Sequence, residues 1–209
     1  MKKLEENSVP RQVEFLFDFG SPTSYIAYRR LATIADRTGA TIVWTPVLLG
    51  AILQSLGNTQ PTAVPAKRKW FFADLALWAR QFGIEYQENP HFPVVTLALQ
   101  RGAIALQGSP LFAAYVEAVF SAMWQTPRNL GDATVLEQVL TSAGIDTEDF
   151  KARIGSPEVK NRLKANTDSA ISRGVFGCPS FFVGDQLFFG QDRLHFVEEA
   201  LLAQPGELP

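Results

Sequence analysis

Apolar and polar residues alternate along residues 13–19, near the start of the chain. A period of two is typical of a β-strand with one face in a core, and the apolar positions here are Val13, Phe15, Phe17 and Phe19. The pattern stops at Gly20 and becomes helical from Pro22 to about Thr38, with Gly39 placed as a helix stop. The sequence therefore predicts a strand that is followed closely by a helix.

A second strand is predicted at residues 40–47, ATIVWTPV, because β-branched residues are frequent there. The order strand, helix, strand, with a crossover of this length, predicts a parallel βαβ unit. Near the other end of the chain, residues 180–183 and 187–189 are predicted to form a hairpin around the turn-forming pair Gly184-Asp185.

The middle of the chain has a different pattern, in which the apolar periodicity is mostly helical. Residues 48–60 are predicted to form short turns, and the chain is predicted to be helical almost without interruption from Lys69. A stripe of large side chains marks the first helix and ends at Gly83: Phe71, Leu75, Trp78 and Phe82. Further helices are predicted at 109–125, 132–143, 147–154 and 157–173, and from Gln191 to about Leu202. We expect core packing to explain most of these stripes.

The composition is that of a globular protein with a sizeable core, and it excludes some partners. The 209 residues suffice for one large domain or for a domain with an insertion, and 46% of them are hydrophobic and 19% charged. The net charge is −2 and no basic run is present, so nucleic acid is not an expected partner. No apolar stretch approaches the roughly 20 residues that span a bilayer, so no membrane association is expected.

A few residues indicate where the protein is located and whether it binds a metal. The segment MKKLEENSVPRQ has no apolar core, so we do not expect it to be a signal peptide. A single cysteine, Cys178, excludes an internal disulfide, so we expect a cytoplasmic protein. His91 and His195 are far apart in the sequence, and Cys178 has no partner at ligand spacing, so we expect no metal site.

The candidate chemistry lies at the junction of the first strand and helix, FDFGSPTSYIA at residues 17–27. Serine is a favoured helix N-cap, and proline is favoured at the first helical position. The same pair also occurs at Ser109-Pro110 and Ser156-Pro157, where helices are predicted to begin. Taken alone, Ser21-Pro22 is therefore interpreted as a cap.

The place of Ser21 in the predicted fold favours a second role. It follows the carboxyl end of a strand in an open parallel sheet, where ligands bind. A helix N-terminus carries unpaired N–H groups and about half a positive charge, so it stabilises an anion. A serine without a neighbouring base is a poor nucleophile but a good hydrogen-bond donor. We therefore expect Ser21 to donate to a thiolate or oxyanion that a ligand supplies.

A second signal is the tetrapeptide Gly177-Cys178-Pro179-Ser180, just before the predicted hairpin. A proline that enters a strand is unusual. A cis bond before it would make a tight turn with exposed backbone groups. The Cys178 side chain itself can be simply a small buried apolar group.

These segments together resemble one protein family. The combination is FDFxSPxSY, a helical insertion, FGxPxFxVG before the hairpin and FGxDR before the last helix. It is similar to the 2-hydroxychromene-2-carboxylate isomerases and the kappa-class glutathione transferases over nearly all of residues 12–203. The resemblance implies an α/β, thioredoxin-like fold with a large all-helical insertion. Residues 10–48 and 156–203 would form a discontinuous thioredoxin-like domain, and residues 49–155 the inserted helical domain.

The resemblance also implies the source of the reactive thiol. Disulfide-exchanging relatives carry Cys-x-x-Cys where this chain has Ser21 and Ser24, and thiol exchange needs an attacking thiolate. This departure removes dithiol chemistry. In the serine-bearing relatives glutathione supplies the thiol, and Ser21 is implied to be the catalytic residue that donates a hydrogen bond to it and favours its thiolate form.

Further positions match the glutathione-binding residues of the family. Cys178 and Pro179 match the cis-proline turn, where the backbone of residue 178 pairs with the cysteinyl backbone of glutathione. Gln191 and Asp192 match the site of the γ-glutamyl end, although Asp192 is equally well interpreted as a helix cap.

Two more matches and one departure concern the rest of the site. Asn58 and Lys67 match glutathione contacts of kappa-class relatives, and Lys67 is either the partner of the glycyl carboxylate or a solvated lysine. The second substrate is expected beside the thiol, under aromatic side chains such as Trp70, Phe71 and Trp78. Lys67, Lys69 or Arg101 could bind a substrate carboxylate. Val95 stands where isomerase-like members are expected to have asparagine.

Three functions follow from this reading. The favoured one is a glutathione-dependent cis-trans isomerase that acts on an aromatic or conjugated keto acid of the 2-hydroxychromene-2-carboxylate type. The second is a kappa-class-like transferase that conjugates glutathione to electrophiles. The third is a non-catalytic glutathione-binding or chaperone-like protein. The resemblance implies a homodimer in each case.

Overall fold

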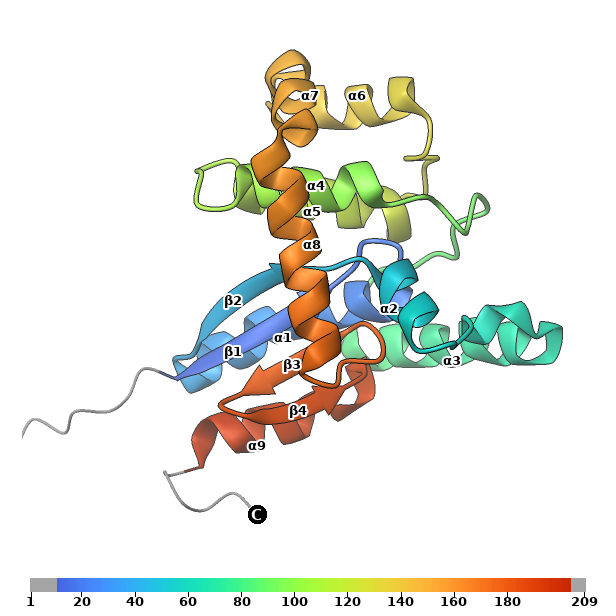
Figure 1. Ribbon diagram of the computed structural model, residues 1–209. Helices are drawn as coiled ribbons and strands as arrows, with labels where there is room; N and C mark the ends of the chain where they lie inside the picture. The colour runs from blue at the N-terminus through green and yellow to red at the C-terminus, as the bar shows by residue number, and fades with distance from the viewer. Residues whose placement is uncertain (1–10, 204–209) are drawn as a thin grey trace, which may run out of the picture.

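The computed structural model describes residues 11–203, which form a four-stranded mixed sheet with helices on both faces (Figure 1). Strand β1 (Gln12–Phe17) lies between β2 (Thr41–Pro46), which is parallel to it, and β3 (Ser180–Val183), which is antiparallel. Strand β4 (Gln186–Phe189) pairs with β3 and forms one edge, so the order is β2-β1-β3-β4. The predicted parallel pair and the predicted hairpin are both confirmed.

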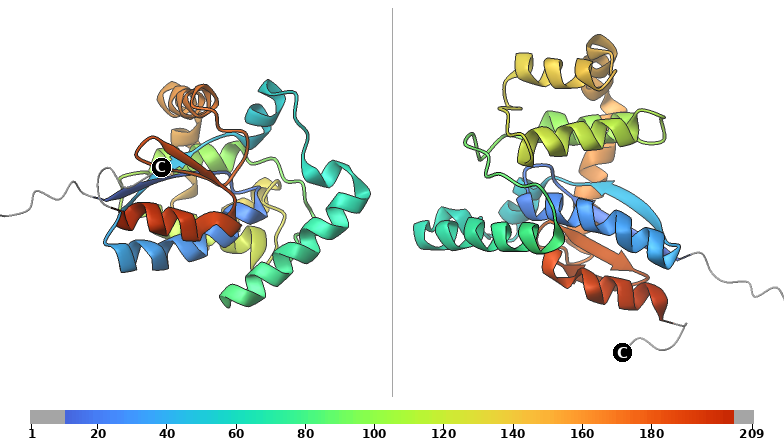
Figure 2. Two further views of the ribbon diagram at one scale, coloured as in Figure 1. Left: turned by 90° about the horizontal axis from the view of Figure 1, so that it is seen from below. Right: turned by 180° about the vertical axis from the view of Figure 1, so that it is seen from behind.

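Both faces of β1 are covered, which explains why most of its residues are apolar. Phe15 and Phe17 belong to the cluster that includes residues of α1 (Pro22–Thr38) and α9 (Leu194–Leu202). Leu16 belongs to a second cluster, with residues of α2 (Leu49–Ser55) and α8 (Pro157–Ser172). Figure 2 shows α1 and α9 side by side on one face of the sheet, and α8 crosses the opposite face.

Four helices form a stack beyond one end of the sheet (Figure 1): α4 (Leu97–Leu106), α5 (Phe112–Trp124), α6 (Ala133–Ser142) and α7 (Thr147–Gly155). Helix α3 (Pro65–Phe82) precedes them in the chain and extends to one side (Figure 1). The ring of Phe19 packs on those of Phe120 and Tyr115, with centroids 4.7 and 5.9 Å away, so one core continues from the sheet into the insertion. The predicted fold class is confirmed, and the division into domains 10–48 with 156–203 and 49–155 stays a prediction.

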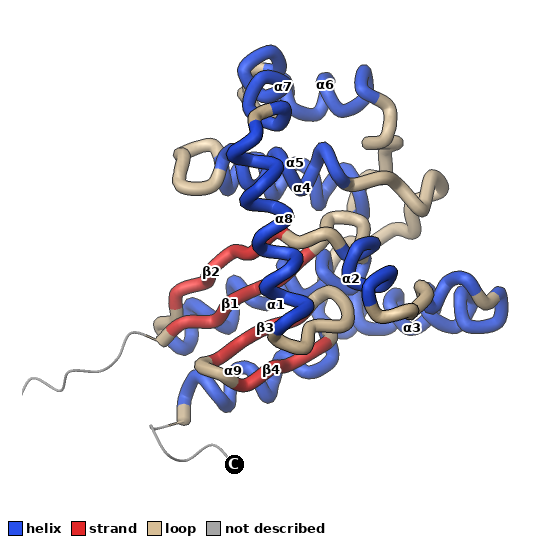
Figure 3. The backbone as a smooth tube through the Cα atoms, viewed as in Figure 1, coloured by secondary structure: helices blue, strands red, loops and turns tan. Residues whose placement is uncertain are grey.

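Helix α2 is a correction to the sequence analysis, which predicts only short turns at residues 48–60 (Figure 3). Its N-cap, Leu48, has no side-chain acceptor. The carboxylate of Asp18 instead accepts a hydrogen bond from the Leu49 N–H at 2.9 Å. Because this acceptor comes from a distant residue, no local capping signal is present in the sequence.

Several helix boundaries also differ from the predictions. Helix α3 begins at Pro65 rather than Lys69, and its buried residues are Phe72, Leu75 and Ala79, so the predicted stripe is displaced around the helix. Residues 84–96 contain no helix, and the prolines at 90 and 93 lack the N–H group that a helix interior needs. The prediction of nearly uninterrupted helix from Lys69 is therefore wrong.

Two helix starts are later than predicted. Ser109-Pro110 does not begin a helix, because α5 starts at Phe112. The last helix is preceded by a short 3₁₀ turn, η2 (Gln191–Arg193), and α9 begins at Leu194. Among residues 11–203, every helix is too short or too polar to cross a membrane.

Candidate active site

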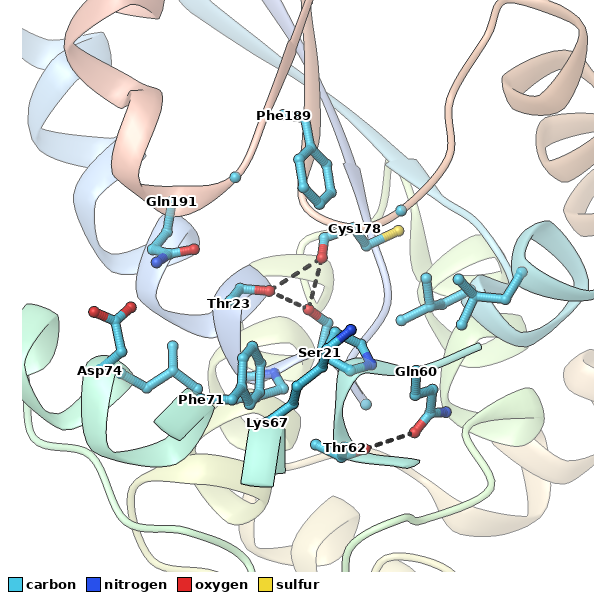
Figure 4. Close-up of a pocket in the computed structure, with 18 of the residues that line it drawn as sticks. Ser21, Thr23, Gln60, Thr62, Lys67, Phe71, Asp74, Cys178, Phe189 and Gln191 are labelled. Atoms are coloured by element: carbon cyan, nitrogen blue, oxygen red, sulfur yellow. Dashed lines mark hydrogen bonds between the residues drawn. The ribbon is translucent and has the colours of Figure 1, made fainter. Parts of the chain in front are cut away.

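A cavity of about 520 Å³ opens at the carboxyl end of β1 (Figure 4). Its walls come from the first turn of α1, the segments before β3 and after β4, α2, α3 and the short turn η1 (Pro61–Ala63). Most of the residues that sequence analysis selected lie on these walls: Ser21, Asn58, Lys67, Cys178, Gln191 and Asp192. Pro179 does not line the cavity but forms a cis peptide bond with Cys178. The fold thus brings together residues from both ends and the middle of the chain.

Ser21 is both the N-cap of α1 and a donor at the cavity. Its Oγ accepts a hydrogen bond from the Ser24 N–H at 3.1 Å, which is the capping contact that the sequence predicts. The same hydroxyl lies 2.9 Å from the carbonyl of Cys178, to which it can donate, and the residue is only 3% exposed. A hydroxyl held at a helix N-terminus can turn its proton toward an anion bound there.

Thr23 is a site residue that the sequence analysis missed. Its Oγ1 lies 2.7 Å from Ser21 Oγ and 3.0 Å from the carbonyl oxygen of Cys178. Two hydroxyls of one helical turn therefore share one carbonyl (Figure 4). The hydroxyl at the third position of Ser-Pro-Thr-Ser was the signal that could have identified it.

The carbonyl and the sulfur of Cys178 point in different directions (Figure 4). The carbonyl faces the two hydroxyls, whereas the residue packs in the apolar cluster with Leu16 and Val47. Burial, together with the negative charge of Asp18, raises the pKa of the Cys178 thiol well above its ordinary value. The thiol stays protonated, so Cys178 contributes its backbone to the site.

The loop before Ser21 is held from behind by the buried side chain of Asp18. Its carboxylate accepts hydrogen bonds from the N–H groups of Gly20 and Leu49, each at 2.9 Å, and one from the Thr96 side chain. Burial raises the pKa of Asp18 above its ordinary value, and these hydrogen bonds oppose that rise. The carboxylate thereby connects the end of β1 to the starts of α2 and α4.

Two buried side chains of the insertion hold the backbone of residues 17–19. The amide of Gln100 donates to the carbonyls of Phe17 and Val47 at 2.7 Å each and accepts from the Phe19 N–H at 3.3 Å. The indole of Trp124 donates to the Phe19 carbonyl at 2.8 Å. The insertion therefore positions the segment from which Ser21 follows.

Polar side chains lie on opposite sides of the cavity (Figure 4). Gln191 is buried at the start of η2, and Asp192 beside it pairs with Arg193. Lys67, on α3, is exposed and forms no ion pair with any residue that the structure describes. Asp74 of α3 also lines the cavity, and sequence analysis did not select it.

Aromatic side chains form much of the remaining wall. Trp70, which is 66% exposed, and Phe71 line the cavity as expected, but Trp78 does not. Phe176 and Phe189 line it from the segments around β3 and β4, with ring centroids 4.5 Å apart. A Cβ atom at Gly177 would lie 2.7 Å from the Phe189 ring, so a larger residue there would force this ring to move.

The positions considered for a second substrate are only partly at the cavity. Lys69 and Arg101 do not line it, whereas Arg193 does. Val95 is 79% exposed and belongs to a neighbouring hollow with Val94. Within residues 11–203, no group of three His, Cys, Asp or Glu side chains is arranged to hold a metal ion.

Comparisons with known proteins agree with this architecture. Residues 12–202 match the family of the DSBA-like thioredoxin domain. The 2-hydroxychromene-2-carboxylate isomerase of Sphingobium xenophagum is 32% identical, over 92% of this chain and 98% of the relative. Glutathione S-transferase kappa 1 of Caenorhabditis elegans is 26% identical, over 96% and 94%. A solved structure of a 2-hydroxychromene-2-carboxylate isomerase matches with a TM-score of 0.82 at 30% identity, over 91% of this chain and 94% of that one. The chain therefore belongs to the DSBA-like thioredoxin family, in the branch that holds the 2-hydroxychromene-2-carboxylate isomerases and the kappa-class glutathione transferases.

Proposed function

We propose that this protein is a glutathione-dependent isomerase of the 2-hydroxychromene-2-carboxylate type. The observation that carries the proposal is the Ser21 hydroxyl, which lies at the N-terminus of α1 and faces the cavity beside the cis Cys178-Pro179 turn. The names of the isomerase relatives support the reaction class. The kappa-class relatives support glutathione as the source of the thiol.

The polar groups on the cavity wall fit the parts of glutathione. We assign the γ-glutamyl end to Gln191 and Asp192, whose amide and carboxylate suit a zwitterionic group. We assign the cysteinyl backbone to the backbone N–H of Cys178, because the Cys178 carbonyl faces the hydroxyls of Ser21 and Thr23. The glycyl carboxylate is assigned to Asn58 and Lys67, because Lys67 lacks an acidic partner among the described residues.

Bound glutathione would supply a thiolate that adds reversibly to a conjugated carbonyl compound and so permits rotation about a double bond. Ser21 would stabilise the negative charge by donating a hydrogen bond to the thiolate, and the N-terminus of α1 would add positive potential. Trp70 and Phe71 would cover the flat part of the substrate. With Lys67 assigned to glutathione, Arg193 is the remaining cationic side chain on the cavity wall among the described residues, so it is the candidate for a substrate carboxylate.

A glutathione transferase of the kappa type is the second candidate. The aromatic wall of Trp70, Phe71, Phe176 and Phe189 favours it, because a transferase needs only an apolar cleft beside the thiol. Geometry at Ser21 would activate the thiol in the same way for both reactions. The two functions differ in whether glutathione is returned.

The deciding experiment follows product and free thiol together. The protein is incubated with a hydroxychromene carboxylate and substoichiometric glutathione. We expect many turnovers with the thiol pool intact. Loss of one thiol for each product molecule would establish the transferase. If the protein uses glutathione catalytically with a different conjugated keto acid but not with the hydroxychromene carboxylate, the mechanism is retained and the named substrate is discarded.

Binding of glutathione is tested separately by thermal unfolding. If only the folded state binds, the stabilisation at 100 times the dissociation constant is about 2.7 kcal/mol. A melting curve that glutathione leaves unchanged would contradict both enzymatic proposals and favour the third candidate, a chaperone-like protein without glutathione chemistry. The homodimer and the cytoplasmic location that we propose are tested by sedimentation and by cell fractionation.

Disulfide exchange is not expected of this protein. Ser21 and Ser24 cannot form a disulfide, and the thiol of Cys178 is buried. Reduction of insulin by dithiothreitol should therefore proceed at the uncatalysed rate. Catalysis that is lost in Cys178→Ser would instead identify Cys178 as a reactive thiol.

A further inference from the structure

Three oxygen atoms at the start of α1 form a closed hydrogen-bonded set with only two protons. Ser21 Oγ and Thr23 Oγ1 are 2.7 Å apart, and they lie 2.9 and 3.0 Å from the carbonyl oxygen of Cys178. Each hydroxyl has one proton, and the carbonyl has none to give. The acceptor to which Ser21 donates its hydrogen bond therefore depends on the acceptor that Thr23 uses.

The lone pairs of Ser21 Oγ are already partly used. The Ser24 N–H donates to this oxygen at 3.1 Å as the helix cap. Ser21 can therefore donate a hydrogen bond to the Cys178 carbonyl, to Thr23 or to a ligand, while its oxygen still caps the helix. If its proton turns toward a ligand, the Cys178 carbonyl needs another donor, because the residue is 95% buried by neighbouring groups (5% exposed).

Thr23 is the donor that can take over this carbonyl. Among the residues that the structure describes, the hydroxyls of Ser21 and Thr23 are the groups that donate to it. We propose that Thr23 is a positioning residue, which holds the Cys178 carbonyl and so leaves the Ser21 proton free for a bound thiolate. This inference rests on the proposed glutathione function.

The competing arrangement, in which Ser21 donates to Thr23, is weaker once an anion is present. A hydrogen bond to a charged acceptor is roughly twice as strong as one between neutral groups. The Ser21 proton therefore turns to the thiolate, and Thr23 keeps its own proton on the carbonyl. Without the Thr23 hydroxyl, the carbonyl and the thiolate compete for the single proton of Ser21.

The test measures the pKa of the bound thiol rather than turnover. Glutathione is bound at saturation to wild type and to Thr23→Val, and the ultraviolet absorbance of the thiolate is titrated with pH. We expect the pKa of the bound thiol to rise by about one pH unit in Thr23→Val, which is roughly a tenfold loss of thiolate near neutral pH. Thr23→Ser, which retains the hydroxyl, should restore the wild-type curve.

Two variants keep the result interpretable. Thr33→Val makes the same chemical change at an exposed position of the same helix and should titrate like wild type. Thr23→Ala removes the hydroxyl with a smaller side chain and is used in the same titration, so that a folding defect of Thr23→Val leaves the test intact. Thermal unfolding of each variant with and without glutathione verifies folding and binding.

Different failures point to different errors. Coincident curves for wild type and the Thr23 variants would overturn the positioning role. A shift in Thr23→Val that Thr23→Ser does not reverse would assign the effect to packing and overturn it as well. If the thiol bound to wild type titrates like free glutathione, the proposed thiolate chemistry at Ser21 itself fails, and the inference falls with it.

Discussion

Two helices of this protein begin with the same dipeptide and the same cap. At Ser21-Pro22 the serine Oγ accepts from the N–H of Ser24 at 3.1 Å, and at Ser156-Pro157 it accepts from the N–H of Val159 at 3.2 Å. Proline occupies the first turn in both helices. By local structure alone, the starts of α1 and α8 are equivalent.

The surroundings of the two serines are what differ. Ser156 lies half-buried where α7 ends and α8 begins, and its hydroxyl makes no other hydrogen bond to the described residues. Ser21 is buried at a cavity, and its hydroxyl also meets Thr23 and the Cys178 carbonyl. Capping uses one lone pair of a serine and leaves its proton free, so tertiary structure decides whether a cap is also a candidate catalytic group.

The largest effect that we expect concerns the buried side chain that holds the segment before Ser21. Gln100→Leu leaves the Val47 carbonyl and the Phe19 N–H without partners, and the Phe17 carbonyl keeps only its bond from the Val47 N–H. At about 1 kcal/mol for each of the three lost hydrogen bonds, we expect a loss of about 3 kcal/mol. Urea unfolding measures it. The matched control is Gln107→Leu at the end of α4.

Gln107 makes hydrogen bonds to the Trp44 carbonyl and to Arg162 of α8, but its position is half-buried. Water can replace these partners, so we expect a loss of less than about 1 kcal/mol. Equal losses for the two glutamine variants would show that long-range hydrogen bonds do not distinguish the surroundings of Ser21 from those of α8.

The next effect concerns turnover. Ser21→Ala removes a hydrogen bond to the developing thiolate, and loss of one such donor costs about a hundredfold in rate. Ser156→Ala removes only a cap and should keep the wild-type rate per folded molecule. Initial rates with glutathione and a hydroxychromene carboxylate measure both variants. A fall of similar size in both would mean that helix capping, rather than the free proton of Ser21, explains the loss.

Sequence patterns predicted much of the fold because many of its elements depend on local periodicity. Strand β1, α1 with its left-handed Gly39, β2, the hairpin and helices α6 to α8 all lie within a few residues of their predicted positions. Helix α2 was missed because its first N–H bonds to the distant Asp18 carboxylate. The start predicted at Ser109-Pro110 was wrong because the Ser109 hydroxyl accepts from the Leu111 N–H, two residues on, in a turn that precedes α5.

The site was predictable where a residue's place in the predicted fold, or the family resemblance, indicated its role. Ser21 followed from its place after a strand, and the other selected residues followed from the family resemblance. Thr23, Gln100 and the pair Phe176 and Phe189 were missed because their roles depend on contacts between distant segments. No periodicity in the chain shows that a carbonyl at Cys178 meets a hydroxyl at Thr23.

A smaller effect is expected from pH, because Asp18 is a buried carboxyl behind Ser21. Burial raises its pKa in the folded state above the ordinary value of 3.8. The folded protein therefore binds this proton more tightly than the unfolded chain, and the resulting stabilisation is fully present below the unfolded pKa and lost as pH rises through the folded pKa. The free energy of unfolding of wild type relative to Asp18→Asn should thus decrease between acid and neutral pH.

The pH series is measured by urea unfolding, with Thr33→Val as a control that adds and removes no titrating group. This control should follow wild type at every pH. If the free energy of unfolding of wild type instead rises toward neutral pH relative to that of Asp18→Asn, the three hydrogen bonds to the carboxylate outweigh its burial.

The smallest expected difference is the one between the two caps themselves. Ser21→Ala and Ser156→Ala each remove one acceptor from a helix N-terminus, and such a change costs about 1 kcal/mol. Ser21 also donates to the Cys178 carbonyl, but Thr23 remains 3.0 Å from that oxygen and can still donate to it. We therefore expect the two variants to lose nearly equal stability in urea unfolding, even though only one of them loses turnover. The double variant Ser21→Ala with Thr23→Val removes both donors. Its loss of stability should therefore exceed the sum of the losses in the two single variants. Additive losses would mean that the carbonyl finds another donor, and Ser21 would then differ from Ser156 only by its place at the cavity.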